Sequence, residues 1–279
     1  MDGPNDPALP NNNIDDRSFP QLYNVHFIGH INNDPNSVSS DDQEPAVVRL
    51  REGTGGWFGN IVVANIGTAG VLHGDCGQEV FTQDLAVATA SANNGDRNFL
   101  YWSSQNVVYT AGSGALQHDQ SDTSCSTGAS KPAFASLDLD PMLVLQDMTP
   151  SQDTVFTDPR PVPDGTLFND VETPPADGFF DAVDYKGGFS ADENWLVGLS
   201  WLDENARTPD NVGGILTGED ITTDTTWFND RPILLTDQVF VRNEATLTIE
   251  QGTTILAYAD NGAGLAPSLI VEQGATLMA

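Results

Sequence analysis

The sequence predicts an all-β fold with little helix. Short runs rich in β-branched and aromatic residues recur along the 279 residues, and Gly, Asn, Asp and Ser bound them, which is typical of strands and turns. No segment keeps the 3.6-residue period of an amphipathic helix, and only residues 142–148 and 191–199 could form helical turns. A short segment also occurs twice near the end of the chain, which favours stacked coils over a β-sandwich.

Strand-forming runs follow one another through the first part of the chain. They lie at residues 22–29, 46–50, 57–66, 79–87, 98–102 and 105–110. Residues 150–178 contain too many prolines for interior strands, because proline cannot donate a hydrogen bond to a neighbouring strand. We expect an ordered surface excursion or a covering arm there, and a disordered segment is the alternative.

The repeat lies in the C-terminal part of the chain. TIEQGTTILA at 248–257 aligns with IVEQGATLMA at 270–279, an offset of 22 residues. A period in the twenties is typical of one coil of a parallel β-solenoid, so we expect the two EQG triplets to stack on adjacent coils. Short strands are expected at 239–242, 245–249 and 253–258, with Leu247, Ile249 and Ile255 facing the interior.

Several strings resemble a known group of secreted right-handed parallel β-helix proteins, which are common in marine microbes. GEDITTDTTW at 218–227 and ATLTIEQGTTI at 245–255 resemble the N-terminal cap and first coils of that group. FPQLYNVHFIG at 19–29 and RLREGT at 49–54 resemble its late coils, and residues 179–204 resemble its closing segment. The resemblance is good over roughly 19–67 and 179–279 and poor between them.

The order of these strings implies parts of two tandem modules, because the strings that resemble the end of a β-helix precede those that resemble its beginning. Residues 1–204 would be the last coils and closing segment of one module, 205–214 a linker, and 215–279 the cap and first coils of a second, truncated module. We therefore expect the chain to be a piece of a longer protein. A set of aromatic residues would plug the open end of the first core: Phe179, Phe180, Tyr185, Phe189, Trp195 and Trp201.

The charge balance excludes several classes of partner. Asp and Glu number 40 against 10 Lys and Arg, a net charge of −30, whereas binding to nucleic acid needs clustered cations. The same charge argues against docking on an anionic membrane surface, and no apolar run is long enough for a transmembrane segment. Dense carboxylates suit a marine or saline extracellular setting, where salt screens their repulsion. We expect a secreted or cell-surface protein whose export signal lies outside this sequence.

The two cysteines, Cys76 and Cys125, leave two interpretations open. A disulfide between them would fit an exported protein with a large core. Two buried thiols fit the sequence equally well.

Calcium is the cofactor that the loops favour. Loops rich in Asp, Asn and Gly offer the oxygen ligands that Ca²⁺ prefers, although none has the EF-hand spacing. The candidate ligands are Asp34, Asp41, Asp42, Asp260 and Asn261.

No residue is assigned a catalytic role. Paired acids such as Asp138 and Asp140 are interpreted as solvated surface, and Arg51 as a partner of Glu52 or of a neighbouring coil. His73 precedes Cys76 closely, but a nucleophilic cysteine also needs an oxyanion loop, which the sequence does not indicate.

We expect a non-catalytic structural or adhesive protein that contacts extracellular polysaccharide, with calcium, or a neighbouring cell-surface protein. A polysaccharide lyase or glycoside hydrolase on a β-helix scaffold is the alternative.

Overall fold

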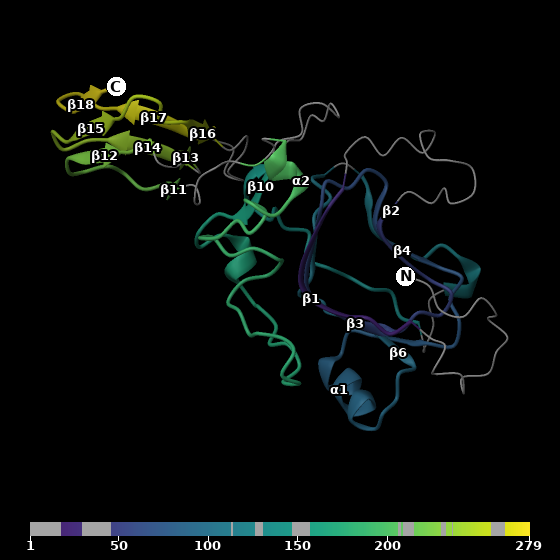
Figure 1. Cartoon of the computed structure of the whole chain (residues 1–279). Helices are drawn as coiled ribbons and strands as arrows, with labels where there is room; N and C mark the ends of the chain where they lie inside the picture. Colours follow the sequence, from purple (N-terminus) through teal and green to yellow (C-terminus); the bar gives the residue numbers. More distant parts are fainter. Residues whose placement is uncertain are drawn as a thin grey trace. The chain divides into compact units, whose positions relative to one another are not determined.

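The computed structural model describes residues 18–29, 46–112, 114–125, 131–146, 157–205, 208, 215–229, 233–235, 237–257 and 266–279. Over these residues strands dominate and helices are few, which confirms the all-β character. The sheets are short, mostly parallel and not closed. The chain divides into two compact units, which are described separately (Figure 1).

The two units do not coincide with the predicted modules. The first comprises Met1–Pro141, Met148–Thr154 and Thr166–Phe189, and the second Met142–Asp147, Val155–Gly165 and Ser190–Ala279. Residues 190–204 therefore lie with the second unit. That the chain joins two tandem modules at residues 205–214 stays a prediction.

The first unit contains two parallel sheets, and the chain crosses between them several times. The first sheet has the order β1-β3-β6-β5, with β7 also paired to β3. Its strands are β1 (Gln21–Ile28), β3 (Gly56–Ala64), β5 (Val80–Thr82), β6 (Phe99–Trp102) and β7 (Val107–Val108). The second sheet has the order β2-β4-β8, formed by β2 (Ala46–Arg51), β4 (Ala69–Gly74) and β8 (Leu116–Asp119). In Figure 1 the β1 and β3 strands lie across the unit from β2 and β4.

Asparagines mark the same bend in successive strands of the first sheet. Asn24 and Asn60 have φ values of 57° and 52°, a left-handed conformation that asparagine tolerates better than most residues. Asn60 Nδ2 donates to Asn24 Oδ1 at 2.9 Å. Asn106 lies between β6 and β7, where its Nδ2 donates to Phe58 O and its Oδ1 accepts from Ile61 N, both at 2.9 Å. Side-chain hydrogen bonds of these asparagines therefore connect each bend to the neighbouring strand.

Strand β3 is buried on both faces, which explains why its apolar residues do not alternate with polar ones. Phe58, on one face, packs in the core between the two sheets with Val71 of β4. Trp57, on the other face, belongs to a second aromatic cluster with Phe99 and Ala88. Helix α1 (Leu85–Asn93) contributes Ala88 and lies on the outer side of this sheet in Figure 1.

Two expectations for local structure were wrong. The run 79–87 is a strand only as far as Thr82, because Asp84 begins a helix. The described residues of the 142–148 run, 142–146, form no helical turn, since β9 (Leu143–Gln146) pairs antiparallel with β10 (Thr157–Pro161). In the 191–199 region the structure has the expected turns, since Leu199 N and Ser200 N both donate to Leu196 O, and the short helix α2 (Trp201–Glu204) follows. Two 3-10 turns, η2 (Thr123–Cys125) and η3 (Thr166–Phe168), complete the helical elements of the described residues.

The second unit contains three short parallel sheets that the chain visits in fixed rotation. Their orders are β11-β13-β16, β14-β17 and β12-β15-β18, and Ile221 bridges to Val241 of β14. Successive passes are thus β11, Ile221, β12, then β13, β14, β15, then β16, β17, β18. The strands are β11 (Ile215–Thr217), β12 (Thr225–Trp227), β13 (Ile233–Leu235), β14 (Gln238–Val241), β15 (Thr246–Ile249), β16 (Ile255–Ala257), β17 (Ser268–Val271) and β18 (Thr276–Met278).

The predicted register of the EQG triplets is wrong. Leu247 pairs with Leu277 and Val241 with Val271, so β17 and β18 lie 30 residues from their partners and not 22. An offset of 22 does occur, but between Ile233 and Ile255 and between Thr225 and Leu247. The triplets therefore follow strands of different sheets.

In the second unit, interior-facing side chains are buried in the middle pass, β13 to β15, and more exposed in the last pass, β16 to β18. Leu247 is fully buried, whereas its partner Leu277 is 44% exposed, and Val241 and Val271 differ in the same way. No described strand pairs with β18 on its far side. Ile255 lies in register with the buried Ile233 but is 38% exposed, and no described strand pairs with its strand β16 on the far side either.

Candidate functional site

A groove of about 430 Å³ lies on the first unit, beside the β1-β3-β6-β5 sheet. Gln21 of β1 and Trp57 of β3 lie at the sheet, α1 forms one wall, and residues 173–177 form the other. This volume is within the range of small-molecule sites in proteins. The groove is therefore the candidate functional site.

Helix α1 forms where it does because Asp84 caps it. Asp84 Oδ1 accepts hydrogen bonds from Ala86 N at 2.8 Å and from Val87 N at 3.3 Å, two of the backbone donors that a helix leaves unpaired at its start. Ala88 is fully buried against the aromatic cluster. The turns that carry Thr89 and Asn93 are consequently held over the groove, and both residues are exposed.

The opposite wall is anchored at Glu172. Its carboxylate accepts from Tyr23 Oη at 2.8 Å and from Tyr101 Oη at 2.6 Å. Its backbone is bound as well, since Asn60 Nδ2 donates to Glu172 O at 2.8 Å and Asn60 Oδ1 accepts from Glu172 N at 2.9 Å. Pro174 and Pro175 then stiffen the chain that follows. The wall is fixed at one end by four hydrogen bonds.

Both tyrosines stay protonated at neutral pH, as donation to a carboxylate requires. Burial, followed by the neighbouring Glu172 carboxylate, raises the pKa of Tyr23 well above its ordinary value. Burial and the hydrogen bond to Glu172 raise the pKa of Tyr101 in the same way. The anchor therefore persists across the physiological pH range.

The groove has a one-sided charge. Asp177 is the only charged residue among the described residues that line it. Lys186 interacts with Asp170 and Glu172, but its side chain is 1% exposed, and burial lowers its pKa. The described lining of the groove therefore contains no Lys or Arg.

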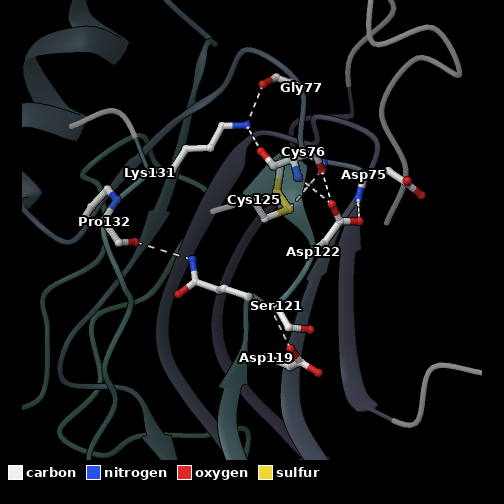
Figure 2. The surroundings of a disulfide bond; sticks show 11 residues. Asp75, Cys76, Gly77, Asp119, Ser121, Asp122, Cys125, Lys131 and Pro132 are labelled. Atoms are coloured by element: carbon white, nitrogen blue, oxygen red, sulfur yellow. Dashed lines mark hydrogen bonds between the residues drawn. A yellow bond between two sulfur atoms is a disulfide. The ribbon is translucent and has the colours of Figure 1, made fainter. Parts of the chain in front are cut away.

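The disulfide forms a second well-ordered feature, at one end of the sheet that contains β4. Cys76 and Cys125 are bonded, with Cα atoms 5.1 Å apart (Figure 2). Ser124 Oγ accepts from Cys76 N at 2.8 Å, and Lys131 Nζ donates to Gly77 O and Ser124 O, each at 2.8 Å.

Asp122 completes this end. It accepts from the Ser124 hydroxyl and backbone N–H, both at 2.7 Å, and from Asp75 N at 3.2 Å, and these bonds hold the pKa of its carboxyl below the ordinary value. The described donors of this cluster are already paired with protein acceptors. The arrangement therefore indicates a structural role, in which the disulfide and its hydrogen bonds hold this end of the sheet together.

The remaining predicted residues do not converge on a site. The calcium candidates Asp34, Asp41, Asp42, Asp260 and Asn261 lie outside the described residues. Asp138 accepts from Thr110 N and Oγ1 at 2.8 Å. Arg51 Nε lies 3.7 Å from Glu52, the partner the sequence suggested. Within the described part of the chain, no three His, Cys, Asp or Glu side chains are grouped to hold a metal ion.

His73 lies in an aromatic core and not beside a nucleophile. Its ring centroid is 5.1 Å from that of Phe81 and 5.2 Å from that of Phe134, and the side chain is fully buried. Burial lowers its pKa to about 3, so the ring is neutral at physiological pH. Because Cys76 is in a disulfide, the pair cannot act as a thiol with its base.

Sequence reasoning missed the residues of the groove. One signal could have revealed its helical wall, because Asp84 is followed by an alanine-rich segment that ends at Asn94 and Gly95. No local signal points to the Glu172 anchor.

Comparison of the sequence with protein-family models finds no match, and neither does comparison with curated proteins or with solved structures. Among the helices that the structure describes, none has the length and apolar character needed to cross a bilayer.

Proposed function

We propose that this chain is a non-catalytic, secreted or cell-surface protein with a right-handed parallel β-helix fold, and that it has a structural or adhesive role in contact with extracellular polysaccharide. The observation that carries the proposal is the groove beside Trp57, a mixed polar and apolar depression on a stack of parallel strands.

The strand order supports the β-helix. In the second unit successive strands pass to three sheets in rotation, each pairing in parallel with the strand one pass earlier. Connections between parallel strands of one sheet are right-handed in almost all proteins, which gives the expected hand.

The disulfide supports an extracellular setting. Such bonds persist mainly in oxidising compartments, and Cys76–Cys125 is integrated with the Ser124 and Lys131 hydrogen bonds around it. The net charge of −30 agrees with a saline environment.

Binding and turnover can be separated in one experiment. The purified chain would be tested for retention by a panel of neutral, uronate-containing and sulfated polysaccharides, while released reducing ends and unsaturated uronates are measured. Retention without product supports the proposal. Product release would replace it with the enzyme alternative, and no retention by any polysaccharide would exclude the binding role.

Calcium is part of the proposal through the acidic loops at Asp34, Asp41, Asp42 and Asp260. Millimolar Ca²⁺ should raise the melting temperature more than NaCl of equal ionic strength, since a site with a Kd of about 100 μM in about 10 mM Ca²⁺ adds roughly 2.7 kcal/mol. Two double variants would identify the loop, one with Asp41 and Asp42 replaced by alanine and one with Asp260 and Asn261 replaced. The variant that removes the Ca²⁺ site should show the same melting temperature in Ca²⁺ as in NaCl of equal ionic strength. Equal effects of the two salts on the unaltered chain would mean that Ca²⁺ acts only through ionic screening and binds no specific site.

A further inference from the structure

We infer that the groove between α1 and residues 173–177 binds an uncharged segment of polysaccharide and discriminates against uronate and sulfate groups. This inference rests on the proposed polysaccharide contact and names its site and the class of sugar.

The polar groups of the groove match hydroxyl groups. Gln21 and Asn93 carry side-chain amides, each of which can both donate and accept, and Thr89 and Thr173 carry hydroxyls that do the same. Asp177 only accepts, so it needs donors, and sugar hydroxyls are donors. All five side chains are exposed at the groove and project from both of its walls and from β1.

The apolar part of the groove matches the C–H faces of a sugar ring. Leu85, Ala92 and Pro175 line it together with Trp57. Trp57 is only 4% exposed, because its ring packs against Phe99 and Tyr101 with centroids 5.5 Å and 5.4 Å away. It therefore acts as a fixed floor and does not swing to meet a ligand.

The charge of the groove decides which sugars fit. Carboxylate and sulfate groups are recognised by Arg and Lys through charge-assisted hydrogen bonds, and none of these residues is among the described lining. An acidic sugar would instead meet Asp177 on a chain with a net charge of −30. Neutral sugars incur no such repulsion.

The groove is organised before a ligand arrives. Glu172, one residue before the wall begins, is held by Tyr23, Tyr101 and Asn60. Within the wall, Asp177 N donates to Pro175 O and Asp177 Oδ1 accepts from Phe179 N, both at 2.9 Å. A wall that is already ordered loses little conformational entropy on binding.

The test uses the full chain in affinity electrophoresis through gels that contain laminarin or glucomannan, both neutral, or alginate or carrageenan, both acidic, with and without calcium. We expect retardation by a neutral polysaccharide. Ala92→Trp and Thr89→Trp, which fill the groove from exposed positions on α1, should each weaken binding roughly tenfold or more, equivalent to the loss of one well-placed contact. Ala90→Trp, exposed on the same helix but outside the groove lining, should leave binding unchanged, and the melting temperatures of the three variants should agree.

A charge reversal tests the discrimination separately. Asp177→Lys should increase retardation by alginate more than Asp181→Lys, which makes the same change at an exposed position outside the groove lining. Equal increases would mean that only net charge matters and would overturn the selectivity.

The other outcomes separate this inference from the proposed function. Retardation by acidic polysaccharides alone would overturn the inference and leave the polysaccharide contact standing. Neutral binding that survives both tryptophan variants would place the contact elsewhere on the protein. No retardation in any gel would overturn both.

Discussion

The side-chain amide of Asn60 brackets the backbone of Glu172, 112 residues further along the chain. Its Nδ2 donates to Glu172 O at 2.8 Å and its Oδ1 accepts from Glu172 N at 2.9 Å, so one amide satisfies both polar groups of a distant residue. Asn60 is fully buried and has a left-handed backbone conformation within β3. A bend in a strand thus sets the position of the groove wall.

Asn60→Ala should lower the free energy of unfolding by about 3 kcal/mol. The change leaves the partly buried backbone N–H and C=O of Glu172 without their Asn60 partners, and an unpaired buried group costs about 1–3 kcal/mol. Urea unfolding followed by circular dichroism would measure the loss.

Asn93→Ala is the matched control, because Asn93 is exposed on α1, and we expect a change within about 0.5 kcal/mol. Equal effects of the two substitutions would show that the Asn60 bracket contributes nothing particular to stability.

Reduction of the disulfide should destabilise the first unit. Cys76 and Cys125 are 49 residues apart in sequence, and closing a loop of that length restricts the unfolded chain by about 4 kcal/mol in the entropic account. Calorimetry with and without a phosphine reductant should show a lower transition temperature in the reduced protein. The Cys76→Ser, Cys125→Ser double variant should melt like the reduced protein and ignore the reductant; a response by this variant would point to another cause.

Acid should destabilise the folded state well before most carboxylates titrate. Burial lowers the pKa of His26 and His118 to about 4 and that of His73 to about 3, each from an ordinary 6.5. The unfolded chain therefore binds more protons than the folded chain below pH 6.5, and the free energy of unfolding falls as the pH decreases from that value towards the folded-state pKa values.

The His73→Leu variant removes the contribution of one of these histidines to the pH dependence of stability. Between roughly pH 6 and pH 5 the slope of stability against pH should become shallower by about 1.4 kcal/mol per pH unit, the contribution of a single proton. Urea midpoints measured at several pH values provide the slope. An unchanged slope would mean that His73 is protonated in the folded protein as readily as in the unfolded one.

Engineered disulfides test the register of the second unit. Thr246 and Thr276 are direct partners in β15 and β18, so Thr246→Cys with Thr276→Cys should oxidise to a cross-link that mass spectrometry detects. Glu250→Cys with Glu272→Cys should not, because Glu250 follows β15 and Glu272 follows β17, in different sheets. Cross-linking of the second pair in place of the first would restore the 22-residue register.

The candidate site was largely beyond prediction from sequence. The helical wall has a local cause in Asp84, and an alanine-rich segment after such a residue indicates a helix. The other wall has none, because Glu172 gains its partners from Tyr23, Asn60 and Tyr101, between 71 and 149 residues away. Hydrogen bonds of that span leave no periodic trace in the sequence.

The sequence by itself determined the all-β character, the position of most strands and the form of the corners in the second unit. Three corners share one local pattern, in which the backbone N–H of Ala245, Thr253 and Ala275 donates to the carbonyl three residues earlier, in Arg242, Glu250 and Glu272 respectively. Only the tertiary structure decided which corner stacks on which. Similar corners have similar local energies, so they do not fix the register. The 30-residue offset pairs Leu247 with Leu277 and Val241 with Val271, which keeps apolar residues in register on the same face of each sheet.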